Sequence, residues 1–176
     1  MIRERMRNIR LLLLDVDGVL TDGRIIYDHN GVETKQFHVR DGHGLKLLQR
    51  AGIQVGIITG RQSEVVALRA RELGIELVFQ GAKNKLEPFR RILQQTGLRP
   101  EQVAYAGDDL IDLPVLRQVG CAFTVADAVE ELFPYVDYVT RRPGGAGAVR
   151  EICDLLLKQS GCWGEVTARY FAEVAE

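Results

Sequence analysis

Short apolar segments alternate with amphipathic segments along most of the chain. Five apolar runs predict β-strands, at Ile9–Val16, Gln54–Thr59, Glu76–Phe79, Val103–Ala106 and Cys121–Val125. The segments between them carry apolar residues at helical spacing, and each predicted helix stops shortly before a glycine, as helix C-termini often do. These helices are expected at residues 43–50, 63–73, from about 88 to 96 and 110–119. An apolar stripe at 149, 152, 153, 156 and 157 predicts a last helix.

Strand–helix–strand alternation predicts a parallel sheet with helices on both faces, a Rossmann-like α/β fold. One passage departs from this pattern. Arg24–Tyr27 and Glu33–Val39 flank Asn30-Gly31, a strong hairpin turn signal. We therefore expect a β-hairpin insertion at about 23–40 within a single domain of residues 1–159, followed by a C-terminal tail at 160–176.

Composition narrows the possible classes of protein. Hydrophobic residues make up 46% of the 176 residues and charged residues 27%, which is typical of a globular chain. The net charge of −1 disfavours a nucleic-acid binder. The three cysteines form no C-x-x-C pair, so a disulfide framework and a zinc site are disfavoured and a cytoplasmic location is expected. The apolar run before Asp15 is too short for a signal peptide, and we expect no membrane span.

Polar residues suited to catalysis follow several of the predicted strands. Asp15 and Asp17 follow the first strand, Thr59–Arg61 the second, Lys85 the loop after the third, and Asp108–Asp109 the fourth. In open parallel α/β sheets the carboxyl ends of the strands form the binding site. We therefore expect these side chains to converge on one edge of the sheet.

The residue types at this edge favour phosphoryl transfer. Clustered carboxylates repel one another unless a hard cation with oxygen ligands lies between them, and Mg²⁺ suits this role. One carboxylate can attack phosphorus, while a second carboxylate, two residues on, can protonate the leaving oxygen and then deprotonate water. Thr59, the Gly60 N–H and Lys85 can hold the phosphoryl oxygens.

Four motifs, in order, resemble those of haloacid dehalogenase superfamily phosphatases: Asp15-Val16-Asp17-Gly18-Val19-Leu20-Thr21, Ile58-Thr59-Gly60, Lys85 and Gly107-Asp108-Asp109. The resemblance implies that Asp15 is the nucleophile and Asp17 the general acid/base. It also implies Mg²⁺ bound by the Asp15 and Asp108 carboxylates and the Asp17 carbonyl, with Asp109 supporting the site from behind. Neither insertion point has room for a cap domain, so a capless member is expected.

Longer stretches resemble the 3-deoxy-D-manno-octulosonate 8-phosphate phosphatase family, to about Leu157: residues 20–23, 37–44, 59–61, 107–114 and 144–151. The resemblance implies hydrolysis of this phosphorylated sugar acid, for lipopolysaccharide synthesis, by a homotetramer built through the hairpin. A relative acting on a nine-carbon sugar acid 9-phosphate has an acidic residue where Arg61 stands, which favours the eight-carbon substrate. The implied substrate contacts are Asp17, His38, Val39, Arg40, Asp41, Gly42, Lys46, Thr59, Gly60, Arg61, Arg69 and Lys85.

Simpler interpretations compete with some of these roles. Lys83 is an alternative to Lys85, and Asp108 or Asp109 can cap the helix that follows. Arg61 and Arg69 can be solvated surface residues. Asp112 is expected to be a first-turn helix residue, and the three histidines lack metal-ligand spacing.

Other functions also compete. A phosphoacceptor receiver domain combines similar residue types, but its acceptor Asp lies on a middle strand, whereas Asp15 follows the first. A catalytically idle tetrameric scaffold is disfavoured because every catalytic position is intact. A phosphatase for nucleic acid or protein is disfavoured by the near-neutral charge.

Overall fold

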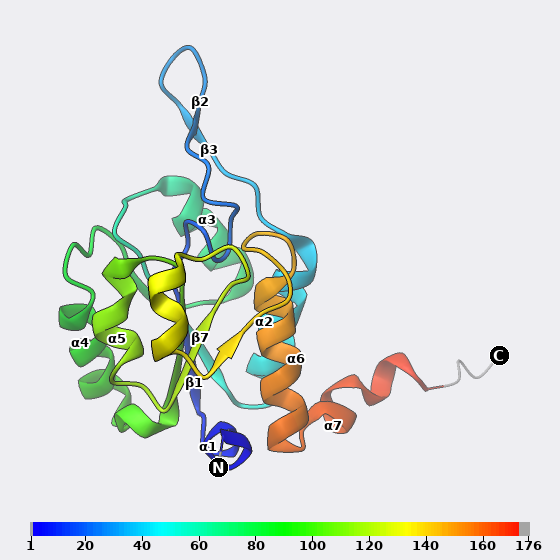
Figure 1. Ribbon diagram of the computed structural model, residues 1–176. Helices are drawn as coiled ribbons and strands as arrows, with labels where there is room; N and C mark the ends of the chain where they lie inside the picture. The colour runs from blue at the N-terminus through cyan, green and yellow to red at the C-terminus, as the bar shows by residue number, and fades with distance from the viewer. Residues whose placement is uncertain (1, 173–176) are drawn as a thin grey trace.

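The computed structural model describes residues 2–172 and contains a six-stranded parallel sheet in the order β5-β4-β1-β6-β7-β8 (Figure 1). A separate two-stranded antiparallel hairpin pairs β2 with β3. The strands are β1 (Leu11–Leu14), β2 (Ile26–Tyr27), β3 (Glu33–Thr34), β4 (Gln54–Ile58), β5 (Leu77–Phe79), β6 (Val103–Gly107), β7 (Cys121–Thr124) and β8 (Tyr138–Val139).

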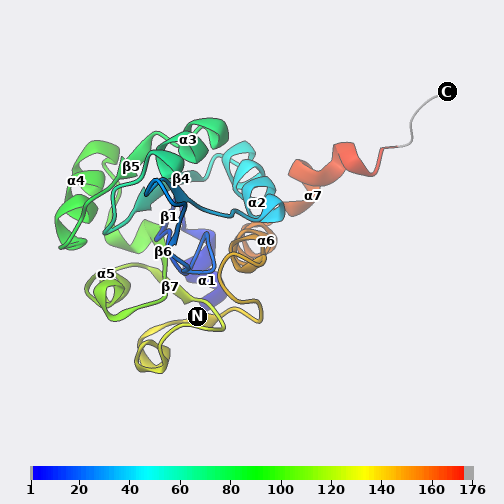
Figure 2. The same cartoon turned by 90° about the horizontal axis from the view of Figure 1, so that it is seen from above.

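Helices cover both faces of the sheet, as Figure 2 shows from above. One face packs against α1 (Ile2–Arg7), α2 (Val39–Arg50), α3 (Glu64–Leu73) and α6 (Ala148–Ser160). The other face packs against α4 (Leu86–Thr96), α5 (Leu113–Leu116) and the 3-10 segment Glu130–Tyr135. The α/β fold with a parallel sheet between helices is confirmed.

The central strand β1 explains why four consecutive leucines precede the acidic motif. Leu12 and Leu14 belong to one apolar cluster, whereas Leu11 and Leu13 belong to the other, and all four are fully buried. A strand covered on both faces needs apolar residues at every position rather than at alternate ones. This burial fixes the position of Asp15 at the carboxyl end of β1.

Several element boundaries differ from expectation. The predicted strand at Glu33–Val39 is wrong beyond Thr34, because Val39 is already the first residue of α2, whose N-cap is His38. The helix predicted at 110–119 is a 3-10 turn (Leu110–Asp112) followed by the short α5. The sequence analysis also missed α1 and β8.

The hairpin projects beyond the carboxyl edge of the sheet (Figure 1). Its apolar side chains Ile25, Tyr27 and Val32 are exposed. At the other end of the chain, α7 (Trp163–Thr167) and a 3-10 turn (Ala168–Tyr170) follow α6, and Tyr170 accepts a hydrogen bond from Arg50 (2.8 Å). Residues 173–176 of the expected tail lie outside the described residues. None of the described helices meets the length and hydropathy needed to cross a bilayer.

The strand order creates a crevice at the centre of the carboxyl edge. The chain leaves β1 through α2 on one face, and after β5 it crosses to β6 on the other side of β1. The loops that follow β1 and β6 therefore diverge, which opens the position where open α/β sheets bind ligands. Asp15 and Asp108 follow these two strands.

Candidate active site

The loop after β1 folds into a tight turn that presents two aspartates. The Val16 carbonyl accepts hydrogen bonds from the N–H groups of Val19, Leu20 and Thr21, at 2.9–3.2 Å. The Thr21 hydroxyl in turn accepts from the Gly18 N–H (3.4 Å) and the Gly23 N–H (3.2 Å). These bonds fix the turn of the Asp-x-Asp-Gly motif, and the Asp15 N–H donates to the Ala106 carbonyl of β6 (2.9 Å), which holds Asp15 in a buried position.

Lys85 is the N-cap residue of α4, and its ammonium reaches the same crevice. Its Nζ lies 2.9 Å from Asp15 Oδ2 and 2.6 Å from Asp112 Oδ1. The side chain is 1% exposed, and its hydrogen bonds join the loops after β1, β5 and β6. Lys83, the alternative from the sequence, is exposed.

Asp112 is fully buried and accepts four hydrogen bonds, which is the full capacity of a carboxylate. Oδ1 receives the Lys85 ammonium and the Tyr105 hydroxyl (2.5 Å). Oδ2 receives the N–H groups of Asp108 (3.0 Å) and Asp109 (3.2 Å). Gly107 makes this approach possible, because a Cβ there would lie 2.3 Å from the Asp112 carboxyl carbon. Asp112 therefore fixes Lys85 and the Asp108 backbone instead of offering a free ligand.

Asp108 lies opposite Asp15 and has a free buried oxygen. Carboxylate oxygens of Asp15, Asp108 and Asp112 lie within 4.8 Å of one another. Among residues 2–172, no group hydrogen-bonds to the buried Asp108 Oδ1. An orphaned carboxylate oxygen beside a second carboxylate suits a hard divalent cation. With Asp112 saturated, Asp15 and Asp108 are the carboxylates that fit Mg²⁺.

The pKa values at the crevice reflect this crowding. Burial, and then the neighbouring Asp112 carboxylate, raise the pKa of Asp15 to about 6. Burial, with Asp15 and Asp112 nearby, raises the pKa of Asp108 to about 8. For Lys85, burial alone would lower the pKa, but the adjacent Asp15 and Asp112 outweigh it and the pKa is raised. Without a divalent cation, the three neighbouring carboxylates carry more negative charge than the Lys85 ammonium alone can balance.

Asp17 points toward the hairpin rather than into the Asp15–Asp108 crevice. Its Oδ1 forms an ion pair with the Lys35 ammonium, and its Oδ2 lies 3.9 Å from Arg61 Nε. Arg61 Nη2 also donates to Glu33 Oε1 (3.1 Å) and to the Tyr27 hydroxyl (2.9 Å). The base of the hairpin thus contributes three polar side chains to the rim of the site.

The end of β4 places Thr59 and Gly60 at the same edge. The Thr59 N–H donates to the Phe79 carbonyl (2.9 Å), and its carbonyl accepts from the Ala82 N–H (3.0 Å). Both backbone groups are therefore used within the sheet edge. At Gly60 the nearest atom to a Cβ position is 3.7 Å away, so the space beside it is open.

The other predicted substrate contacts form a separate group along α2 and α3. His38 caps α2, its Nδ1 accepting from the Arg40 N–H (3.3 Å), and Val39 is exposed. The Asp41 carboxylate is buried and accepts from the Arg150 N–H (2.7 Å), so it caps α6. The set is completed by Arg69, which pairs with Glu72 and packs against Gly42 and Phe37, and by Lys46, beside Gly74.

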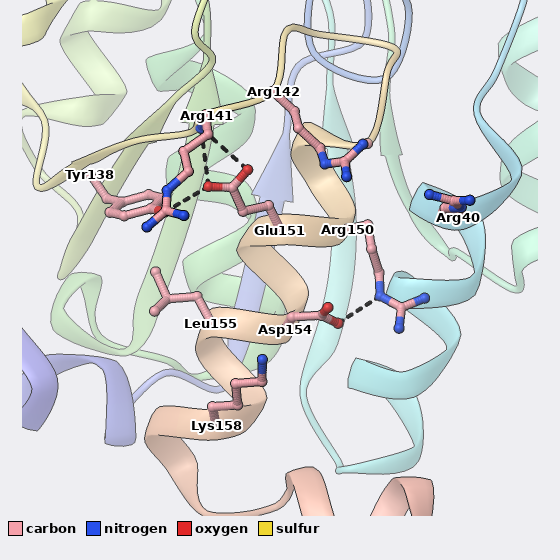
Figure 3. A pocket seen from close by; sticks show the side chains of 10 residues that line it. Arg40, Tyr138, Arg141, Arg142, Arg150, Glu151, Asp154, Leu155 and Lys158 are labelled. Carbon is pink, nitrogen blue, oxygen red and sulfur yellow. Dashed lines mark hydrogen bonds and ion pairs between the residues drawn. The ribbon is translucent and has the colours of Figure 1, made fainter. Parts of the chain in front are cut away.

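Arg40 belongs to a basic groove instead. Figure 3 shows Arg40, Arg142 and Arg150 where the start of α2 faces α6. The groove has a volume of about 870 Å³, and its lining contains none of the crevice carboxylates. Arg150 pairs with Asp154 (2.6 Å) within it. Arg40 therefore lines a different hollow from the one that Asp15 and Asp108 form.

Comparison with known proteins gives the family. Residues 42–120 match the haloacid dehalogenase-like hydrolase family. The 3-deoxy-D-manno-octulosonate 8-phosphate phosphatase KdsC of Escherichia coli K12 is 53% identical over 157 residues, which cover 89% of this chain and 84% of that protein. The chain belongs to this phosphatase family.

Solved structures agree with this assignment. The 3-deoxy-D-manno-octulosonate 8-phosphate phosphatase of Moraxella catarrhalis, solved with magnesium, phosphate and KDO, superposes with a TM-score of 0.94 at 42% identity, over 96% of this chain and 97% of that one. The phosphatase of Yersinia pestis superposes with a TM-score of 0.90 at 49% identity, over 92% and 87% of the two chains.

The sequence analysis missed several residues of the site, including the rim residue Tyr27. Asp112 was expected to be an ordinary helix residue, and Tyr105 was read only as part of a strand. Lys35 and Glu33 lie on a predicted hairpin limb with no motif around them. In an extended chain, side chains alternate between two sides, so Glu33 and Lys35 point to one side and the exposed Thr34 to the other. This spacing is the one sequence signal that indicates a shared inward face for Glu33 and Lys35.

Proposed function

We propose that this protein is a Mg²⁺-dependent phosphomonoesterase that hydrolyses 3-deoxy-D-manno-octulosonate 8-phosphate to the free sugar acid and phosphate. The observation that carries the proposal is the buried Asp15–Lys85–Asp112 ion-pair set beside the orphaned Asp108 oxygen. This arrangement combines a nucleophile, a fixed ammonium and a pair of carboxylates suited to a divalent cation in one crevice. The substrate is assigned from the name of relatives such as the Escherichia coli K12 phosphatase, which is 53% identical over 157 residues.

The metal would be held by the Asp15 and Asp108 carboxylates and the Asp17 carbonyl. Bound there, Mg²⁺ supplies positive charge to the phosphoryl oxygens. Lys85 adds a second, permanent positive charge 2.9 Å from Asp15. The two cations together allow a phosphate dianion to approach a carboxylate that would otherwise repel it.

In the proposed reaction an Asp15 oxygen attacks phosphorus as the bond between phosphorus and the sugar oxygen breaks. Asp17 gives a proton to that leaving oxygen, so the sugar acid departs as an alcohol. Asp17 then takes a proton from water as the water oxygen attacks the aspartyl-phosphate, which releases phosphate and restores Asp15. Thr59, the Gly60 N–H and Lys85 hold the phosphoryl oxygens, and Asp109 supports the loop that carries Asp108.

For substrate recognition, we assign the sugar-acid carboxylate to Arg61, because guanidinium binds carboxylate through two parallel hydrogen bonds. Arg69, Lys46 and residues 38–42 are the further substrate contacts. Within residues 38–42 the Asp41 Oδ1 already accepts from the Arg150 N–H, which leaves its Oδ2 without a partner among the described residues. Among the described residues, the side-chain hydrogen bonds and ion pairs of His38, Asp41 and Arg69 do not involve the crevice carboxylates, which supports a site completed by a neighbouring subunit.

A homotetramer in the cytoplasm completes the proposal. The hairpin projects from the domain with exposed Ile25, Tyr27 and Val32, apolar side chains that association would bury. Equilibrium sedimentation of the full chain measures the assembly. A mass of four chains supports the tetramer, and a monomer at micromolar concentration contradicts it.

Phosphate release with and without Mg²⁺ tests the function across a panel of esters. The panel contains the eight- and nine-carbon keto-deoxy sugar acid phosphates, hexose phosphates and a 3′-phosphorylated oligonucleotide. Strong preference for the eight-carbon ester supports the proposal. Preference for the nine-carbon ester would identify that ester as the substrate. Absence of phosphate release from every ester, in a protein that binds Mg²⁺, would support the scaffold alternative.

A further inference from the structure

Lys35 is a buried lysine outside the family motifs, and its ammonium is held between two carboxylates. It pairs with Asp17 Oδ1 and lies 3.4 Å from Glu33 Oε1, and its side chain is 1% exposed. Burying an ammonium is unfavourable unless it is paired and hydrogen-bonded. The hairpin limb therefore places this charge against Asp17 at a cost that a surface lysine would not incur.

The two oxygens of Asp17 have different surroundings. Oδ1 receives the Lys35 ammonium, whereas the cation beside Oδ2, Arg61 Nε, is 3.9 Å away and too distant for a hydrogen bond. An ammonium has only donor hydrogens, so it binds the unprotonated oxygen of a carboxyl group, the stronger acceptor, in preference to the protonated one. The Lys35 contact therefore favours Oδ2 as the oxygen that carries the Asp17 proton.

We propose that Lys35 is a positioning residue for Asp17, fixing its carboxyl group so that Oδ2 is the oxygen that exchanges protons with the leaving group. The role rests on the proposed phosphatase function and deepens it. During the first step the Oδ2 proton passes to the sugar oxygen as the phosphorus–oxygen bond breaks. During the second step Oδ2 takes a proton from the attacking water, while Lys35 remains on Oδ1 throughout.

Glu33 connects this pair to Arg61. The Glu33 carboxylate accepts a hydrogen bond from Arg61 Nη2 at 3.1 Å and lies 3.4 Å from the Lys35 ammonium, two residues along the same limb of the hairpin. The charges alternate along the rim from Arg61 through Glu33 and Lys35 to Asp17. Because Arg61 also donates to Tyr27, the hairpin holds both the proposed carboxylate contact and the proposed acid/base.

The test compares two esters that differ in their need for a general acid. 6-Phosphogluconate has an alkoxide leaving group that needs protonation, and p-nitrophenyl phosphate has a leaving group that departs without it. The ratio kcat/KM covers the steps through formation of the aspartyl-phosphate, so it reports the proton donation. A misplaced acid costs about 10–100-fold.

For Lys35→Met we expect kcat/KM to fall about 10–100-fold on 6-phosphogluconate and less than about threefold on p-nitrophenyl phosphate. Lys35→Arg restores most of the difference. Asp17→Asn shows the same contrast between esters, and adding Lys35→Met to it causes no further loss, as a double-mutant cycle requires of two residues that act as one unit. The control Lys83→Met changes an exposed lysine near Lys85, and we expect kcat/KM on each of the two esters to stay within about twofold of the wild-type value.

Equal losses on both esters in Lys35→Met would overturn the positioning role and leave a structural one. Full additivity with Asp17→Asn would overturn it as well. If Lys35→Met fails to fold, the contrast between the wild-type chain and Lys35→Arg is measured on the same two esters. Neither ester is the proposed substrate, so a failure of the eight-carbon assignment leaves this test intact. If the wild-type chain hydrolyses only the eight-carbon ester, that ester takes the place of 6-phosphogluconate, and equal losses of Lys35→Met and Lys83→Met on it would overturn the role. Inactivity of the wild-type chain on all three esters would overturn the role of Lys35 together with the phosphatase chemistry.

Discussion

Lys85 and Asp112 form a fully buried ion pair, with 2.6 Å between Nζ and Oδ1. The two residues come from loops after different strands, so the pair sets the spacing between those loops. Because Asp112 also receives the N–H groups of Asp108 and Asp109, the same carboxylate positions the cation and the proposed metal ligand. The positions of the Lys85 ammonium and of the Asp108 loop are therefore fixed before any substrate binds.

Asp112→Asn tests this dependence. One side-chain oxygen would become an NH₂ group, so either the two loop N–H groups or the Lys85 and Tyr105 donors lose their acceptor. We expect a loss of about 1–3 kcal/mol in the free energy of unfolding. Urea denaturation measures it. Glu87→Gln, which removes an exposed pair with Arg91, should cost less than about 0.5 kcal/mol. Similar small losses in both variants would contradict the proposed importance of Asp112.

Gly18→Ala tests the contact between the first motif and Asp108. A Cβ at Gly18 would lie 2.0 Å from Asp108 Oδ2, and φ is +94°. We expect Mg²⁺ affinity, measured by calorimetry, to fall at least about tenfold, or roughly 1.4 kcal/mol. The matched control is Gly31→Ala, with φ of +77° but no described atom within 4 Å of the Cβ position. It should cost about 1–2 kcal/mol of stability and leave Mg²⁺ affinity unchanged. Equal effects on affinity would contradict the account.

Mg²⁺ binding should depend on pH between about 6 and 8, the pKa values of Asp15 and Asp108 without a cation. Both pKa values are raised, so in the metal-free protein these groups favour folding at low pH. That contribution is lost as the pH rises from the ordinary carboxyl range through about 8. Because bound Mg²⁺ needs both carboxylates ionised, its affinity should rise over the same window. Calorimetry at pH 6 and pH 8 measures this, and equal affinities would contradict it.

Arg61→Gln tests carboxylate recognition. Loss of a charged hydrogen-bonded contact costs about 1.5–3 kcal/mol, so kcat/KM for the eight-carbon ester should fall about 10–150-fold. The loss on p-nitrophenyl phosphate, which has no carboxylate, should be much smaller. Arg90→Gln changes an exposed arginine on α4 and should leave both values unchanged. Equal losses of Arg61→Gln on the two esters would remove Arg61 from the recognition role.

The sequence predicted the sheet and the edge where the polar residues meet, because buried strands read as apolar runs and strand ends read as polar motifs. Leu11–Leu14 followed by Asp15 is the clearest instance. It could not predict the partners of Asp112 or Lys35, because those contacts join residues 27 and 18 positions apart through the packing of loops. The early end of β3 was missed for a related reason: His38 stops the extended chain by capping α2, a local competition that apolar alternation does not reveal.

The most direct test of the account is to look for phosphate on Asp15. The wild-type chain is mixed with Mg²⁺ and 3-deoxy-D-manno-octulosonate 8-phosphate, quenched in acid within the first turnover, digested, and mapped by mass spectrometry. The account predicts one phosphoryl group on the peptide that carries Asp15, and neither modification nor phosphate release in Asp15→Asn. Undiminished phosphate release by Asp15→Asn would contradict the account.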